Sequence, residues 1–236
     1  MSPQKTGGLD RELVRDIVQW DATNWAEALR YWERAIDWRG AARKCLELGA
    51  GGGGLSLWLA LKGQDVVCSD LNGVGEKALE LHDRYRVRPS IRYEAIDALR
   101  IPYEGCFDVI VFKSMLGGIG RDDNKARQAA AMSEIRKALR PGGKLLFAEN
   151  LSGAPFHRWA RQSFVAWGKS WRYVSIAEMK EFLMDFASFD LRTTGVMGLF
   201  GRTEGQRNAL GWIDQACLKA LVPPSCRYIA YGVATK

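Results

Sequence analysis

The sequence predicts an α/β fold in which helices cover both faces of a mostly parallel, seven-stranded sheet. Two observations support this prediction. Short apolar runs that are typical of buried strands alternate with longer segments whose apolar residues recur at helical spacing. A glycine-rich stretch, 49–54, also follows the first apolar run and leads straight into a helical pattern. A chain of 236 residues is long enough to bury such a sheet in one domain.

The first 42 residues are predicted to form a helical cap ahead of the main domain, which spans 43–236. Two segments of the cap, 9–20 and about 22–37, carry apolar residues at helical spacing. Asp21 or Thr23 is the expected N-cap of the second helix, because short polar side chains accept hydrogen bonds from the first turn.

The glycine stretch predicts a cofactor site between a strand and a helix. Glycine permits positive φ angles and lets a ligand lie against the backbone, and the helix that follows offers free N–H groups. Gly49, Gly51 and Gly54 match G-x-G-x-x-G, the dinucleotide fingerprint. Gly49, Gly51 and Gly53 match G-x-G-x-G, with Glu47 two residues ahead. The glycines alone do not distinguish these two patterns.

An acid at the end of the second predicted strand points to a cofactor that contains ribose. The strand covers about 65–69 and ends at Asp70, roughly 20 residues after the glycines, where a carboxylate can accept both hydrogen bonds of a ribose diol. Leu71 follows and is expected to pack on the face of an adenine ring.

Two further motifs come in order along the chain. A short turn with Asp97 and Ala98 lies between predicted strands at 90–94 and 107–112. A helix at about 125–139 ends in Leu-Arg-Pro-Gly-Gly and leads into a fifth strand, because proline and glycine stop a helix. Strands at about 190–196 and 228–234 would complete the seven.

From about 44 to 150 this order resembles the class I S-adenosylmethionine (SAM)-dependent methyltransferases. The resemblance implies a Rossmann-like fold whose last strand is antiparallel. It also implies SAM as cofactor and S-adenosylhomocysteine (SAH) as product, with Asp97 reading the adenine amino group. The cofactor-binding residues implied are Glu47, Gly49, Ala50, Gly51, Gly53, Asp70, Leu71, Asp97, Ala98 and Lys113.

The residues expected to act on the methyl acceptor are fewer. A hydroxyl acceptor needs a base with a pKa near the working pH. His157 is the only histidine downstream of the cofactor motifs, so it is the candidate base, with Glu149 as a second. Lys113, after the fourth strand, could stabilise an alkoxide or bind an anionic substrate. We therefore expect O-methylation of a small or sugar-like acceptor, with an anionic or lipid-linked acceptor included.

A basic and aromatic stretch at 155–173 has three interpretations. It is predicted to lie in a lid-like insertion at about 151–174, whose arginines could hold a phosphate or carboxylate. It could also be an interfacial helix that contacts an anionic membrane. The third interpretation is a helix whose aromatic side packs on the sheet.

Other functions remain open from the sequence. The net charge of +7, from 34 Lys and Arg against 27 Asp and Glu, suits an RNA or protein methyltransferase. Methyltransferases of nucleobase amines usually carry Asn-Pro-Pro-Tyr where this chain has 112–115 (FKSM), which argues against nucleobase N-methylation. An NAD-dependent oxidoreductase would use the same glycines and Asp70, and a module that binds SAM without turnover is a further alternative.

The cysteines and histidines bear on location and metals. The five cysteines are scattered and form no C-x-x-C pair, which indicates reduced thiols and a cytoplasmic location. With only two histidines in the chain, no metal site is expected. The sequence does not indicate an oligomeric state.

Overall fold

The computed structural model describes residues 10–164 and 170–236, which form a seven-stranded sheet with helices around it. The strand order is β3-β2-β1-β4-β5-β7-β6, and only β7 runs against its neighbours. The mostly parallel sheet with an antiparallel last strand is therefore confirmed. The strands are β1 (Lys44–Leu48), β2 (Asp65–Asp70), β3 (Ile91–Ala95), β4 (Phe107–Lys113), β5 (Leu139–Asn150), β6 (Ser188–Thr194) and β7 (Ile229–Thr235).

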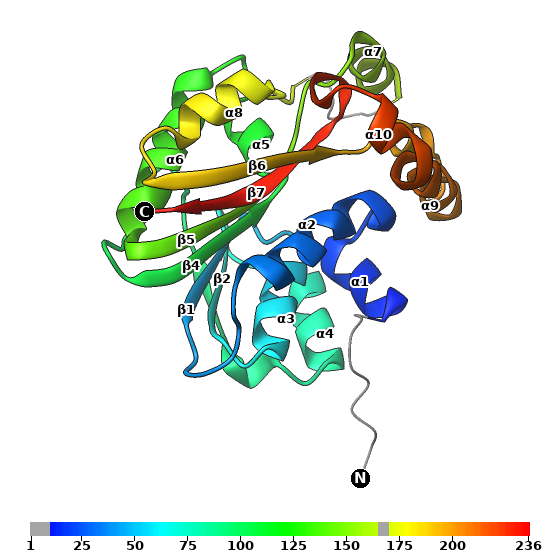
Figure 1. The fold of residues 1–236 in the computed structure, drawn as a ribbon. Coiled ribbons are helices and arrows are strands. Elements are labelled where there is room, and N and C mark those ends of the chain that lie inside the picture. The colour runs from blue at the N-terminus through cyan, green and yellow to red at the C-terminus, as the bar shows by residue number, and fades with distance from the viewer. Residues whose placement is uncertain (1–9, 165–169) are drawn as a thin grey trace.

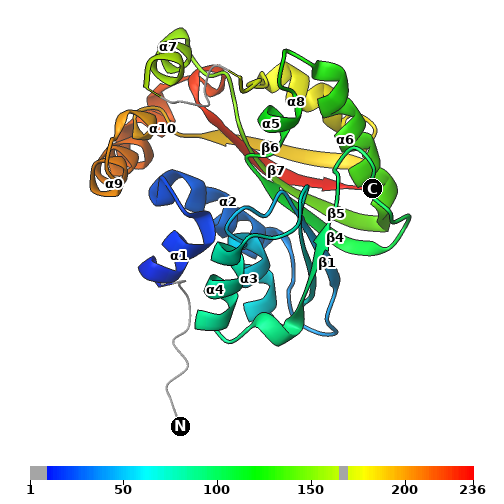
Figure 2. The same cartoon turned by 180° about the vertical axis from the view of Figure 1, so that it is seen from behind.

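The helices are divided between the two faces of this sheet and its carboxyl edge (Figure 1). Helices α1 to α4 cover one face and α5, α6 and α8 the other, while α7, α9 and α10 gather at one end, as the reverse view also shows (Figure 2). The helices are α1 (Arg11–Val18), α2 (Ala22–Ala35), α3 (Gly54–Leu61), α4 (Glu76–Arg84), α5 (Leu116–Ile119), α6 (Lys125–Ala138), α7 (Pro155–Phe164), α8 (Ile176–Leu183), α9 (Glu204–Ile213) and α10 (Lys219–Leu221).

The N-terminal helices share their core with the sheet. Trp25 and Trp32 of α2 are each 1% exposed and belong to the same buried cluster as the strand residues Cys45 and Val111. The indole Nε1 of Trp32 donates to the carbonyl of Gly232 at 2.9 Å. Burying a large aromatic side chain contributes roughly 2–3 kcal/mol, so α2 is held chiefly by these rings.

A second buried cluster lies on the opposite face. Met132 and Ile135 of α6 and Leu183 of α8 pack against Phe112 and Phe147, which alternate along β4 and β5 with residues of the first cluster. Because side chains alternate across a strand, each apolar strand serves both clusters. This two-sided burial explains why the strands read as continuous apolar runs in the sequence.

The start of α2 differs from the predicted cap. Asp21 precedes the helix, but neither it nor Thr23 caps it. The carboxylate of Glu204 instead accepts from the N–H groups of Asp21 and Ala22 at 3.2 and 3.0 Å. Asp21 adopts a φ of 46°, and its own carboxylate turns inward to Tyr228. The cap is thus supplied from 182 residues away, which local sequence does not reveal.

The helical segment between β6 and β7 is broken. It consists of α9, one π-helical turn (Asp214–Leu218) and α10. The carboxylate of Asp214 accepts from the N–H groups of Val196, Met197 and Gly198 at 2.7–3.0 Å, which holds the turn against the loop after β6. π-Turns inside helices commonly position one side chain in this way.

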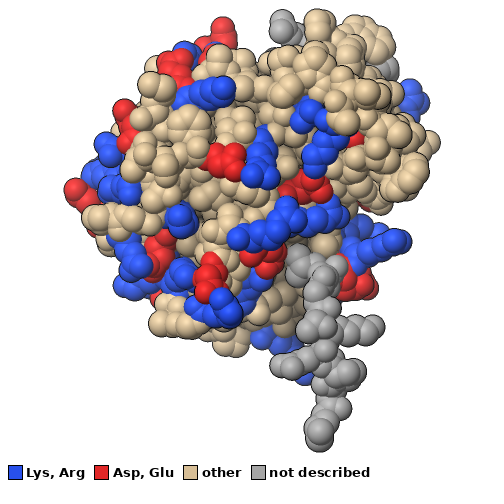
Figure 3. All heavy atoms as spheres, viewed as in Figure 1, with Lys and Arg blue, Asp and Glu red and all other residues tan. Residues whose placement is uncertain are grey.

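Charges of both signs are mixed on the surface. On the face drawn in Figure 3, Lys and Arg alternate with Asp and Glu, and no single-sign patch stands out. Across the described residues, none of the helices is long and apolar enough to span a bilayer. Cytoplasmic location stays a prediction.

Candidate active site

Three glycines shape the bend between β1 and α3. Gly49, Gly51 and Gly53 have φ angles of 63°, 54° and 72°, in the left-handed region that favours glycine. Gly54 does not share this conformation. A Cβ at Gly54 would lie 2.0 Å from the carbonyl oxygen of Ile17, so Gly54 is required by the close approach of α1. The bend itself therefore follows G-x-G-x-G, and the fourth glycine serves helix packing.

Glu47 holds the bend against the helix. Its buried carboxylate accepts from the N–H groups of Leu55 and Ser56, at 3.3 and 2.8 Å, in the first turn of α3. These are groups that a helix leaves unpaired at its N-terminus. Burial raises the pKa of Glu47 to about 7, although the two N–H groups oppose the shift. Its contacts give Glu47 the role of an anchor for the bend.

Asp70 lies directly against the glycine bend. Its Oδ2 accepts from the N–H of Gly51 at 2.9 Å and its Oδ1 from the N–H of Leu71 at 2.8 Å. Each carboxylate oxygen accepts more than one hydrogen bond, so both keep capacity for a ligand hydroxyl. The neighbouring Leu71 is 58% exposed. The structure thus brings Gly51, Asp70 and Leu71 together.

The predicted adenine-reading turn lies beside Asp70. The N–H of Ile96 donates to the carbonyl of Asp70 at 3.0 Å. Asp97 is exposed, its Oδ1 accepts from the N–H of Leu99 at 2.9 Å, and Ala98 is buried beneath it. This local hydrogen bond fixes the turn.

Lys113 ends β4 next to two tryptophans. Its Nζ lies 4.5 Å from the ring centroid of Trp25 and 5.7 Å from that of Trp20. Both distances fit a cation–π interaction. Burial lowers the pKa of Lys113 to about 8, against the attraction of nearby carboxylates that include Glu149 and Glu47. The ammonium is therefore easier to deprotonate than an ordinary lysine.

The residue after Lys113 is strained. Ser114 has a φ of 54°, a conformation that costs a non-glycine residue about 1–2 kcal/mol. The side-chain amide of Asn150 donates to its hydroxyl, and its N–H donates to the carbonyl of Ala148 at 2.8 Å. These contacts from β5 hold the end of β4 in place and set the direction in which the chain leaves Lys113.

Glu149 is fully buried and bonded to the backbone. Its Oε2 accepts from the N–H groups of Met115 and Leu116 at 2.8 and 2.7 Å, and its Oε1 accepts from the N–H of Asn150 at 2.8 Å. Burial raises the pKa of this carboxyl to about 7. Three backbone donors make Glu149 an anchor for the start of α5, and they leave it poorly placed to receive a substrate proton.

His157 lies buried on α7 with both ring nitrogens engaged. Nδ1 accepts from the N–H of Ala154 at 3.1 Å, and Nε2 lies 2.7 Å from the carbonyl of Val196. The first contact needs an unprotonated Nδ1, so Nε2 carries the hydrogen. Burial lowers the pKa of His157 to about 4. The ring offers no free nitrogen to a substrate, and these contacts favour a structural role over that of a base.

Sequence reasoning missed a buried polar network next to Lys113. The hydroxyl of Tyr228 donates to Asp21, and Nδ2 of Asn24 donates to Asp214 at 2.9 Å and to the oxygen of Tyr228 at 3.0 Å. Burial raises the pKa of Asp21 to about 7. Asn24 lies in α2 and Asp214 in the π-turn, whereas Asp21 and Tyr228 immediately precede α2 and β7, so no local pattern in the sequence connects them.

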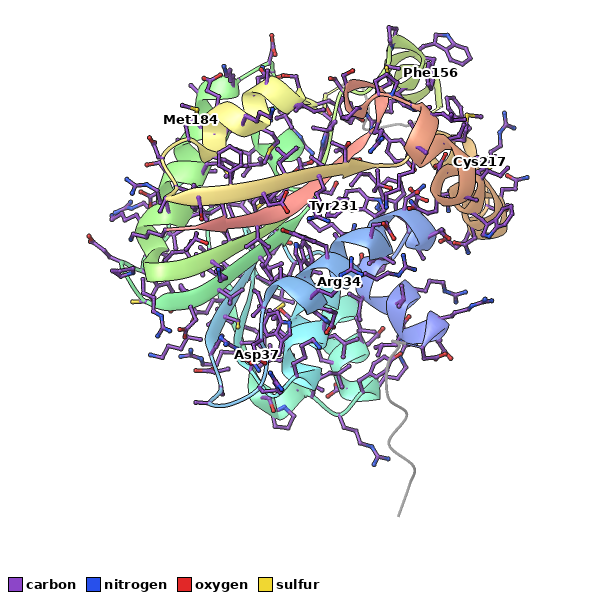
Figure 4. The ribbon with its side chains drawn as sticks, in the orientation of Figure 1. Arg34, Asp37, Phe156, Met184, Cys217 and Tyr231 are labelled. Carbon is purple, nitrogen blue, oxygen red and sulfur yellow. The ribbon has the colours of Figure 1, made fainter. Side chains whose placement is uncertain are left out.

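The predicted lid-like insertion begins and ends side by side. Leu151 and Val174 form a parallel bridge, and α7 lies between them. Phe156 of α7 lies at the end of the molecule that also holds α9 and α10 (Figure 4). Arg172 donates to the carboxylates of Asp123 and Glu178 at 2.9 and 2.5 Å, so its charge is already paired within the protein. Residues 165–169 of the insertion are outside the described part of the chain.

The chain matches known proteins over this region. Residues 46–147 match a family model described as a methyltransferase domain. A demethylmenaquinone methyltransferase of Beutenbergia cavernae is 34% identical over 154 residues, which are 62% of this chain and 58% of that protein. A ubiquinone biosynthesis O-methyltransferase of Psychrobacter cryohalolentis is 35% identical over 106 residues, 44% of this chain and 39% of its own. The matches thus span between about two fifths and three fifths of these relatives.

Solved structures of low identity share the fold. Geranyl diphosphate C-methyltransferase from Streptomyces coelicolor A3(2), solved with Mg²⁺, geranyl diphosphate and SAH, superimposes with a TM-score of 0.61 at 13% identity. The superposition covers 89% of this chain and 78% of that one. Residues 46–147 thus resemble a methyltransferase domain, and the chain shares its fold with this enzyme.

Proposed function

We propose that this protein is a SAM-dependent methyltransferase that methylates a hydroxyl of a small molecule. The observation that carries the proposal is the contact between Asp70 and the N–H of Gly51. It places an acid suited to a ribose diol against a bend whose left-handed φ angles favour glycine. The methyltransferase match of residues 46–147 supports the same assignment.

The residues present suit SAM. A Cβ at Gly51 would meet no atom within 4 Å, so the bend is open on its outer side, where a ligand could approach. In this proposal Asp70 holds the ribose hydroxyls, exposed Leu71 supports the adenine face, and Asp97 accepts from the adenine amino group. Glu47 acts indirectly, because it fixes the first turn of α3.

When bound, SAM supplies a methyl group on a positively charged sulfur. The protein must then align an acceptor oxygen with that methyl and exclude water. Lys113 is the group we assign to the acceptor oxygen, because a cation there stabilises the negative charge that remains once the hydroxyl has released its proton to bulk solvent. Trp20 and Trp25 shield this ammonium from water on the side of α2.

A small-molecule acceptor is supported by the relatives. Two are named as demethylmenaquinone and ubiquinone biosynthesis methyltransferases, and the second is an O-methyltransferase by name. The mixed surface charge in Figure 3 gives no support to an RNA acceptor. An ordinary dinucleotide enzyme has no use for the Asp97 turn beside Asp70.

Calorimetric titration with SAM and SAH tests the proposal. We expect micromolar binding, which Asp70→Ala weakens at least tenfold because the ribose loses both acceptors. Asp65→Ala is the matched control, since it removes the same residue type from the opposite end of β2. Absence of SAM binding by the intact protein would refute the proposal, and NADH binding in its place would support an oxidoreductase.

A further inference from the structure

Three buried hydrogen-bond donors near Lys113 and Glu149 have no acceptor. Over residues 10–164 and 170–236, the Nε1 of Trp25, the Nη2 of Arg161 and the hydroxyl of Tyr173 are buried without a hydrogen-bond partner. Buried polar groups are nearly always paired, so each such atom needs an explanation. All three can donate, which suits a ligand that accepts.

Arg161 is the most unusual of the three. It is 2% exposed, and its Nη1 donates to the carbonyl of Leu151. Its guanidinium carbon lies 4.1 Å from the ring centroid of Tyr173 and 5.8 Å from that of Tyr228. Among the described residues no carboxylate forms an ion pair with it. The guanidinium of Arg161 is thus held in place by one carbonyl and two aromatic rings, and its Nη2 has no hydrogen-bond partner.

A buried guanidinium without a counter-ion is unfavourable. Removing a charge from water costs several kcal/mol unless an opposite charge compensates. Burial accordingly lowers the pKa of Arg161 to about 10. Glu149 is the acid that attracts it, but the two oxygens of Glu149 already receive three backbone N–H groups. An anionic ligand would supply the missing charge.

The position of Arg161 connects it with the proposed reaction site. Lys113 ends β4 opposite Ala148 of β5, and Arg161 donates to the carbonyl of Leu151 directly after β5, so both cations lie at the carboxyl ends of neighbouring strands. Lys113 contacts Trp25, the third unpaired donor. A molecule at Lys113 therefore has a second cation within its neighbourhood.

We propose that Arg161 and the hydroxyl of Tyr173 bind a carboxylate or phosphate group of the methyl acceptor. The unpaired Nη2 and the unpaired hydroxyl are two donors that suit both groups, because each group offers at least two acceptor oxygens. The acceptor is then an acid that carries its hydroxyl apart from its charge, so that Lys113 meets the hydroxyl while Arg161 holds the anion. This inference rests on the proposed function.

Binding of simple anions to the SAH-loaded protein tests this assignment. Benzoate, phenyl phosphate and neutral benzamide are titrated by calorimetry, since aromatic rings surround the site. We expect at least one anion to bind ten times more tightly than benzamide, and the better anion identifies carboxylate or phosphate. Arg161→Gln should abolish that preference. Arg30→Gln, which removes an exposed arginine of α2, is the matched control and should change it less than twofold.

Tyr173→Phe provides a second variant that removes a single hydroxyl. We expect it to weaken the better anion about threefold to tenfold and to leave benzamide unchanged, and it decides the matter if Arg161→Gln does not fold. Equal binding of anions and benzamide by the intact protein, or an unchanged preference in Arg161→Gln and Tyr173→Phe, would overturn the inference. Retained SAH binding in that case leaves the proposed function standing.

Discussion

His157 gives the sharpest test of how burial decides the role of a residue. Its Nδ1 accepts from the N–H of Ala154, its Nε2 donates to the carbonyl of Val196, and the residue is 0% exposed. We consider His157→Gln, because an amide keeps one donor and one acceptor but does not titrate. The wild type and the variant then differ in their pH dependence only through this one group.

The magnitude follows from the pKa. Burial lowers the pKa of His157 from 6.5 to about 4. Each unit is worth 1.36 kcal/mol, so the shift corresponds to about 3 kcal/mol. The unfolded chain takes up a proton as the pH falls through 6.5, whereas the folded protein resists until about 4. Stability from this group is therefore present at pH 7 and lost as the pH falls from 6.5 to 4.

Urea unfolding of both proteins at pH 7, 5.5 and 4 measures the effect. We expect the wild type's advantage over His157→Gln to shrink by about 3 kcal/mol between pH 7 and 4. The buried acids Asp21, Glu47 and Glu149 titrate in both proteins and cancel in the difference. A constant difference across this range would refute the argument. So would an NMR titration that places the pKa of His157 near 7, which would restore its candidacy as a base.

Two further predictions concern the glycine bend and Lys113. Gly54→Ala should destabilise the fold by about 3 kcal/mol in urea unfolding, because its Cβ meets the carbonyl of Ile17. Gly51→Ala should cost only about 1 kcal/mol of backbone strain, and its main effect should be weaker SAH binding in calorimetry. A larger loss of stability in Gly51→Ala than in Gly54→Ala would contradict the conclusion that packing requires Gly54 and backbone conformation requires Gly51. Lys113→Met should lower kcat for SAH formation roughly 10²-fold with SAH affinity within threefold, and an unchanged kcat would exclude its role.

The fold could be predicted because its signals are local. Strands buried on both faces appear as apolar runs, and the Pro-Gly-Gly of 141–143 marks a helix that ends before a strand. The sequence did not reveal the broken helix after Glu204 or the cap that Glu204 gives to α2. The cap joins segments more than 180 residues apart, and the break is held by contacts between Asp214 and the loop after β6, so neither follows from a local pattern.

The proposed cofactor half of the site was easier to predict from the sequence than the proposed acceptor half. The residues of the proposed cofactor half come in motifs along the chain, so spacing named Gly51 and Asp70, and the family resemblance named Asp97. The acceptor half assembles from α2, β4, β5 and α7. Residue type selected His157 there, because histidine is the usual base, yet its two nitrogens are occupied by backbone groups. Four residues along the same helix, Arg161 is the side chain that retains an unused donor.

The glycine stretch explains why counting motifs could not separate two cofactor classes. Four of its glycines together satisfy both patterns, because each pattern uses Gly49 and Gly51 and then either Gly53 or Gly54. The structure requires these glycines for different reasons. Gly49, Gly51 and Gly53 are required by backbone conformation, whereas Gly54 is required by the carbonyl of Ile17 on α1. A glycine in a sequence does not show whether backbone conformation or a close contact requires it. The dinucleotide pattern therefore matched here through Gly54, a glycine that the packing of α1 requires.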